Sequence, residues 1–192
     1  TQGVSSAASD VYKRQPFGTG DGESTALSAF ARVGGDIGNN QNWRLGGYLL
    51  SGESKGSGRK SNEDAVIFKG ESDLYVTDLR YVWAPTGNAR DKEVIFQAEY
   101  FWRSEDGTYQ DTDSSTGIVD FDDSSSGFYV QGVYKFFPRW RAGVRYSKLF
   151  SPDVPQGLVG SALDSVNFDP RAYAVMMDWT NSEFSRVRLQ YN

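Results

Sequence analysis

The sequence predicts an all-β protein, an antiparallel transmembrane β-barrel represented by about eight strands that close a narrow barrel or form an open curved sheet. Three observations predict this fold. Polar and apolar side chains alternate in segments of about ten residues, short and long intervals alternate between the segments, and tryptophans gather at the short intervals. Successive side chains of a strand point to opposite faces, so each segment has one apolar and one polar face.

Composition agrees with this class. Apolar residues make up 38% of the 192 residues and aromatic residues 15%, and there are 21 glycines. A hydrophilic chain rich in aromatics and glycine suits a barrel with lipid outside and a wet interior. A soluble β-sandwich also uses short alternating strands and remains the alternative fold.

Charge and residue usage exclude several functions. The net charge of −5 argues against a nucleic-acid partner. With 0 Cys and 0 His, thiol chemistry and His-dependent triads are excluded and a transition-metal site is improbable. We therefore expect no enzyme activity and no cofactor. Residues 1–15 are expected to be a non-native or disordered leader, and residues 16–192 to be the barrel fragment.

The expected strands follow from the alternation. The clearest unit is 73–103, in which Tyr75, Leu79, Tyr81 and Trp83 take odd positions before a Pro-Thr-Gly-Asn turn and apolar residues take even positions after it. The same reading predicts strands at 24–37, 42–53, 72–84, 92–104, 127–136, 139–149, 171–180 and 184–192.

The intervals alternate in length. Those at 38–41, 85–91, 137–138 and 181–183 are short, whereas 54–71, 104–126 and 150–170 are expected to be long loops. Long loops are uncommon in compact soluble domains. In outer-membrane barrels the short turns face the periplasm and the long loops face outward, so this order favours the barrel over the sandwich.

Tryptophan positions give an independent indication. Trp43, Trp83, Trp140 and Trp179 all lie beside short intervals, whereas Trp102 lies beside a long one. Aromatic residues gather at membrane interfaces, so the first set is predicted to form an interfacial belt. Packing in a core is the alternative explanation.

The residues between the apolar positions of each strand are predicted to form the wall of the lumen. Along the predicted strands, the charged side chains alternate with the apolar ones and so share one face. Because a charge facing lipid would be costly, this face is predicted to point into the lumen. The predicted lumen-lining residues are Arg32, Arg44, Arg80, Arg103, Arg141, Arg145, Arg186, Arg188, Asp78, Glu99 and Asp178, with Gln190 beside them. Such a wall would favour anions. The alternative is that Arg–carboxylate pairs only brace the wall, without net selectivity, and the sequence favours this alternative.

The loop at 105–123 is acidic and lacks Lys and Arg. Asp111, Asp113 and Ser115 begin like a calcium-binding loop, but Thr116 stands where that loop needs glycine. A solvated loop is therefore expected there, and no metal ligand is assigned.

Several segments resemble a known family. They are 78–88 (DLRYVWAPTGN), 99–106 (EYFWRSED), 126–134, 138–146, 169–173 and 178–191. Across residues 70–192 the chain resembles the C-terminal barrel of proteobacterial outer-membrane proteins often labelled zinc-regulated TonB-dependent receptors. The resemblance implies uptake of a metal species and coupling to an inner-membrane energy complex, although this sequence holds no plug domain and no energy-coupling box.

Together these expectations describe a protein of the bacterial outer membrane. Its partners would be outer-membrane lipid and a small hydrophilic solute or metal species that crosses the membrane. A receptor or adhesin acting through its long loops, and a soluble sandwich that binds a ligand, are the alternatives.

Overall fold

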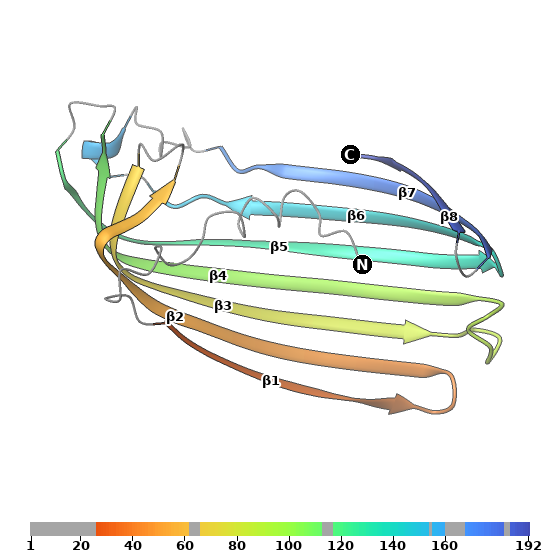
Figure 1. The fold of residues 1–192 in the computed structure, drawn as a ribbon. Helices are drawn as coiled ribbons and strands as arrows, with labels where there is room; N and C mark the ends of the chain where they lie inside the picture. The colour runs from red at the N-terminus through yellow and green to blue at the C-terminus, as the bar shows by residue number, and fades with distance from the viewer. Residues whose placement is uncertain (1–25, 62–65, 113–116, 154, 160–167, 183–184) are drawn as a thin grey trace.

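A single antiparallel sheet of eight strands contains most of the described residues. The computed structural model describes residues 26–61, 66–112, 117–153, 155–159, 168–182 and 185–192. The strands are β1 (Ala26–Ile37), β2 (Gln41–Ser61), β3 (Val66–Trp83), β4 (Glu93–Asp111), β5 (Val119–Phe137), β6 (Trp140–Phe150), β7 (Arg171–Ser182) and β8 (Ser185–Tyr191), and the 3-10 turn η1 is Gln156–Leu158 (Figure 1). The predicted all-β antiparallel class is confirmed. The expected leader at 1–15 lies outside the described residues.

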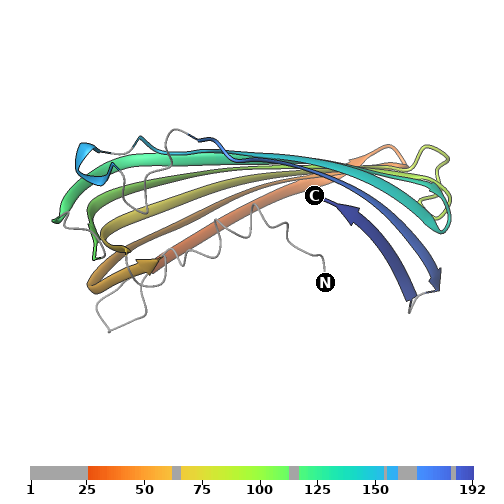
Figure 2. The same ribbon diagram turned by 90° about the horizontal axis from the view of Figure 1, so that it is seen from above.

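The sheet is open. Each strand pairs with its sequence neighbours, so β1 and β8 form the two edges of the described sheet. Viewed from above, the sheet is a single curved layer (Figure 2). The second packed sheet that a sandwich requires does not occur among the described residues. Of the two predicted forms, the described strands adopt the open, curved one.

Two of the three expected long loops are largely strand. β2 and β3 continue pairing past Ser54 and Gly70 and, after a bulge, pair again at Arg59 and Phe68. β4 and β5 pair as far as Tyr109 and Val119. The prediction of loops throughout 54–71 and 104–126 was therefore wrong. The reason is that main-chain hydrogen bonds form a ladder whatever the side chains are, so small or acidic residues do not by themselves end a strand.

The short turns at 38–41 and 85–91 lie where they were predicted, whereas residues 181 and 182 of the turn predicted at 181–183 belong to β7 and residue 183 lies outside the described residues. Gly38 and Gly87 have φ of +64° and +75°, a conformation that L side chains rarely adopt, and they occupy the β1–β2 and β3–β4 connections. The connection from β6 to β7 is long, as expected, and contains η1. We name the end of the sheet with the β1–β2 and β3–β4 turns the turn end, and the opposite end the extended end.

The two faces of the sheet differ sharply. Register pairs Leu45 with Leu79, Leu79 with Ala98 and Ala98 with Val130, so these side chains share one face, which we name the apolar face. The other face, named the polar face, carries the charged residues of the region between the turn end and Arg103, whereas at the extended end both faces carry charges, for example Asp106 on the apolar side. Most large apolar side chains of the apolar face are exposed, for example Val144 at 61% and Leu189 at 71%.

Among the described residues, a cluster of buried apolar side chains forms a small core at the extended end. It consists of Val66, Phe68, Tyr109 and Phe121 from β3, β4 and β5, on the polar face. Two glycines permit this end to form: Gly70 lies opposite Gly107, and a Cβ on Gly107 would come 2.1 Å from the Lys69 carbonyl oxygen. The two backbones thus approach more closely than side chains would allow.

Candidate solute-contacting face

Register brings the predicted lumen residues onto one face of the sheet. Arg32 lies in the row of Gly46, Asp78 and Glu99, and the neighbouring row contains Arg44, Arg80 and Arg145. On the last strands, Arg141, Asp178 and Arg188 form one row, with Arg186 two residues further along β8. Arg103 lies opposite Leu74, on the same face. That these residues line a closed lumen stays a prediction, because the described sheet is open.

Like charges face each other across neighbouring strands. Arg44 is directly opposite Arg80, and Asp78 is directly opposite Glu99. The polar face therefore carries a row of acids beside a row of arginines. Like charges at directly opposite positions repel, so each row depends on its neighbours for compensation.

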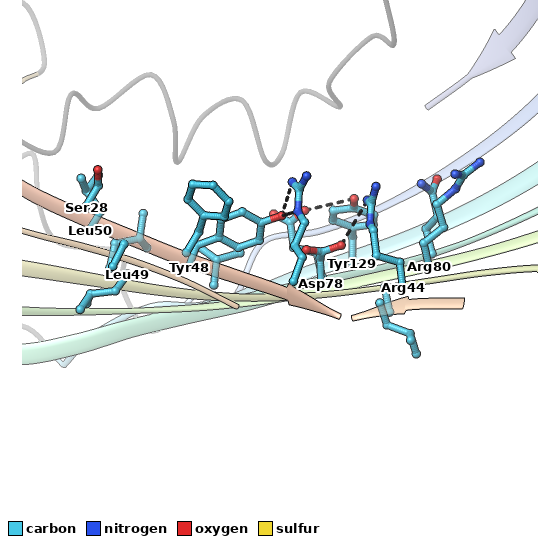
Figure 3. A pocket seen from close by; sticks show the side chains of 17 residues that line it. Ser28, Arg44, Tyr48, Leu49, Leu50, Asp78, Arg80 and Tyr129 are labelled. Carbon is cyan, nitrogen blue, oxygen red and sulfur yellow. Dashed lines mark hydrogen bonds and ion pairs between the residues drawn. The ribbon is translucent and has the colours of Figure 1, made fainter. Parts of the chain in front are cut away.

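These rows border a hollow of about 530 Å³ on the polar face. Figure 3 shows Arg44, Asp78, Arg80 and Tyr129 rising from the sheet on the same side, with the ends of Arg44 and Arg80 away from the strands. Arg32, Tyr48, Gln97 and Glu99 also line the hollow, and its other end is apolar, with Leu50 and Leu74.

The compensation within the hollow is incomplete. Arg44 Nη2 lies 3.4 Å from Asp78 Oδ1, and Arg32 Nε donates to the Tyr48 hydroxyl at 2.7 Å. Tyr129 donates to Glu99 Oε2 at 3.3 Å. Arg80 makes no hydrogen bond or ion pair to any described residue, and its Nε is buried. Of the three guanidinium groups that line the hollow, Arg44 contacts an acid, Arg32 contacts the neutral Tyr48 hydroxyl, and Arg80 contacts no described acid.

Other arginines of the polar face are engaged. Arg188 donates through Nε and Nη2 to the two carboxylate oxygens of Asp178, at 2.7 and 2.9 Å. The Arg145 guanidinium lies 3.8 Å from the centre of the Tyr129 ring, a cation–π contact. The Arg188–Asp178 pair is the kind of contact that the bracing alternative expects, whereas the Arg145 contact is to an aromatic ring.

A buried charged cluster lies at the extended end, beside the small core. Arg59 Nη2 is 2.5 Å from Glu105 Oε1, and Arg103 also bonds this carboxylate. Tyr109 donates to Glu105 Oε2 at 3.0 Å and accepts from Arg59 at 2.9 Å. Burial would raise the pKa of Glu105, but the two guanidinium groups outweigh it and lower the pKa below its usual value. Burial and the Glu105 charge raise the pKa of Tyr109 to about 12.

The sequence reasoning missed Arg59 and Glu105 because both fell in segments expected to be solvated loops. The two-residue alternation does continue into these segments. Phe68, Tyr109 and Phe121 each lie an even number of residues from the polar-face residues of their own strand, so their side chains lie on that face. Arg59 departs from that parity, because the bulge between Ser54 and Arg59 shifts the register of β2.

The predicted tryptophans lie on the apolar face at the turn end. Trp43 is paired with Tyr81, Trp83 with Val94, and Trp140 with Trp179, whose ring centres are 6.3 Å apart. Their contact with lipid stays a prediction.

A second aromatic row, which the sequence reasoning did not identify, crosses the same face towards the extended end. Tyr75 stacks on Trp102 with ring centres 5.6 Å apart, and Tyr146 contacts both Phe128 and Tyr173 at 5.8 and 4.9 Å. Between the two rows, the apolar face of the described strands carries no charged side chain.

Metal ligands are not gathered anywhere in the described ranges: no group of three or more acidic residues there could hold an ion. Asp113 and Ser115 of the acidic segment lie outside the described residues. In the part of the chain that the structure describes, no helix is long and apolar enough to cross a membrane.

The fold and its faces define an all-β antiparallel sheet protein with one apolar and one charged side. An uncharacterized protein of Aquifex aeolicus (strain VF5) is 28% identical to the chain over 162 residues, which are 84% of this chain. The match covers 32% of that relative, so the chain spans about a third of its length. No family model and no solved structure matches the chain.

Proposed function

We propose that this chain is part of an outer-membrane β-barrel that lets small hydrophilic solutes cross the membrane. The observation that carries the proposal is the chemical contrast between the faces. One face is apolar, exposed and uncharged between two aromatic rows, whereas the other holds arginines, acids and a hollow. Barrels of this membrane alternate in the same way, with the apolar side towards lipid.

The distance between the two aromatic rows is close to the thickness of the apolar part of a membrane, which supports the proposal. Tyr75 and Trp83 lie in the two rows on β3, eight residues apart, which is roughly 26 Å at about 3.3 Å per residue. A strand tilt of about 40° reduces the height to roughly 20 Å, close to the ~25 Å apolar band of outer-membrane barrels. Exposed apolar side chains over this height would be costly in water, and lipid removes that cost.

A receptor acting at the extended end is the second candidate. It is favoured by β2, β3, β4 and β5, which continue beyond the second aromatic row and hold their own core at Phe68 and Tyr109. Uptake of a metal species, and coupling to an inner-membrane energy complex, depend only on the family resemblance of residues 70–192.

Matched arginine substitutions test the membrane orientation. Val144 on the apolar face and Gln190 on the polar face lie in adjacent rows of the register, at the same depth. We expect Val144→Arg to hinder folding into phospholipid vesicles by about 2–4 kcal/mol, and Gln190→Arg to have little effect. Folding would be followed by protease protection and by the shift in gel mobility on heating.

The same two variants distinguish a membrane-embedded sheet from a sheet that is soluble in water. Val144 is already 61% exposed, so in water an arginine there should be tolerated. Equal vesicle insertion by both variants, or a cooperative melt of the wild-type chain without detergent, would contradict the proposal. Release of a neutral sugar from vesicles that contain the folded protein tests solute passage directly.

A further inference from the structure

We propose that Arg44 and Arg80 form a binding station for the oxyanion group, a carboxylate or a phosphate, of a small solute in the hollow. The inference rests on the proposed function in taking the polar face as the side that meets solute, and it deepens that function by naming a substrate class.

The two arginines are placed where an anion is needed. They are directly opposite each other on β2 and β3, and such neighbours have Cβ atoms about 4.5–5.5 Å apart. Two like charges this close destabilise the sheet unless a negative group compensates them. Their guanidinium ends project together into the hollow (Figure 3).

The protein supplies only part of that compensation. Asp78 contacts Arg44 through a single 3.4 Å approach, and Arg80 contacts no acid among the described residues. The Nε atoms of both arginines are buried and have no hydrogen-bond partner. An unpartnered donor destabilises the folded chain, and an oxyanion bound to the ends of the two guanidinium groups would supply the negative charge that the protein does not.

The other charges that line the hollow do not neutralise Arg80. Glu99 receives the Tyr129 hydroxyl hydrogen bond, and Arg32 bonds the Tyr48 hydroxyl. The lining therefore contains the guanidinium groups of Arg32, Arg44 and Arg80 against the carboxylates of Asp78 and Glu99, an excess of one positive charge.

The chemistry of the pair suits an oxyanion. A guanidinium presents its N–H groups in a planar fork that matches carboxylate or phosphate oxygens. A hollow of about 530 Å³ lies within the roughly 300–1,000 Å³ range of small-molecule sites. The apolar end near Leu50 and Leu74, which are paired on the polar face, would accommodate a short hydrocarbon portion of the same solute.

The test is binding of inorganic phosphate to the folded chain in a neutral detergent, measured by phosphorus NMR. Because the detergent carries no phosphate group, binding reports a free anion rather than a lipid headgroup. Loss of one charged hydrogen-bonding group should weaken binding about tenfold or more in Arg80→Gln. Arg90→Gln is the matched control, since it removes the same charge from an exposed turn.

A second variant, Arg80→Lys, keeps the proposal testable if Arg80→Gln does not fold. Arg80→Lys keeps the charge and loses the planar fork, so phosphate binding should weaken several-fold. Equal affinity in wild type and both Arg80 variants would overturn the site, as would an equal loss in Arg90→Gln. Vesicle insertion without Arg80-dependent binding would defeat the anion site alone. Arg80-dependent binding without insertion would support the site and defeat the proposed membrane function.

Discussion

Gly46 lies directly opposite Asp78, and a Cβ on Gly46 would come 2.1 Å from Asp78 Oδ2. The Asp78 carboxylate therefore occupies the space that a side chain on β2 would fill. From this position Asp78 reaches Arg44 on the same neighbouring strand. The glycine thus positions the acid that partly neutralises the Arg44–Arg80 pair.

Gly46→Ala should displace Asp78 and destabilise the folded protein. Overfilling a packed site costs about 1–3 kcal/mol, and the ion pair with Arg44 would be lost as well. Gly47→Ala is the control, because its Cβ would meet no atom within 4 Å. Urea unfolding of the protein in detergent measures both variants, and equal stability would show that Asp78 moves aside freely.

Gly107→Ala should disrupt the extended end while leaving the rest of the sheet paired. Its Cβ would come 2.1 Å from the Lys69 carbonyl oxygen, a backbone atom that cannot move alone. Gly132→Ala, whose Cβ meets nothing within 4 Å, is the control. Limited proteolysis should cut only the first variant faster within β3 and β4. An unchanged digestion pattern would mean that the backbones separate without cost.

Glu105→Gln should destabilise the extended end, because it leaves Arg59 and Arg103 without their shared carboxylate. Removing one partner of a buried ion pair costs about 3–5 kcal/mol. Asp106→Asn is the control, since Asp106 is the exposed neighbour on the opposite face. Hydrogen exchange of the β4 amides measures the local effect. Equal protection in the two variants would argue against the cluster.

Acid should weaken the same end in the wild-type protein. The folded-state pKa of Glu105 lies below its usual value, so the unfolded state binds its proton first as pH falls. The stabilisation is fully present above the unfolded pKa of about 4.3 and is lost as pH falls through the folded pKa. Glu105→Gln should abolish this acid dependence.

Alkali should weaken the extended end through Tyr109. Its pKa is raised to about 12 in the folded state, against about 10 in the unfolded chain. The stabilisation is therefore full below pH 10 or so and falls by about 3 kcal/mol as pH rises to about 12. Tyr109→Phe should remove this dependence and the last tyrosinate absorbance step. A wild-type titration complete by about pH 11 would contradict the burial of the hydroxyl.

Much of the fold was predictable because alternation is local. The direction of a side chain from a strand depends only on its position, so the shared phase of Arg80, Arg145 and Arg188 could be read from residue order. The short turns were equally local, since Gly87 and its neighbours define a turn without distant contacts.

The lengths of β2, β3, β4 and β5 were not predictable in the same way. Whether a polar segment is a loop or a strand depends on whether a partner backbone lies beside it. The bulge after Ser54 and the close approach at Gly70 and Gly107 determine that for the extended end.

By itself, the sequence determined which residues share a face and that one face is apolar, because period-two alternation is a property of the strand alone. Only the tertiary structure decided which charges meet. Arg59 and Glu105 lie 46 positions apart and pair across β2, β3 and β4. Arg44 faces Arg80, and among the described residues Asp78 is the acid that contacts this pair. Register determines these contacts, because it depends on turns, bulges and close backbone approach along the whole strand pair.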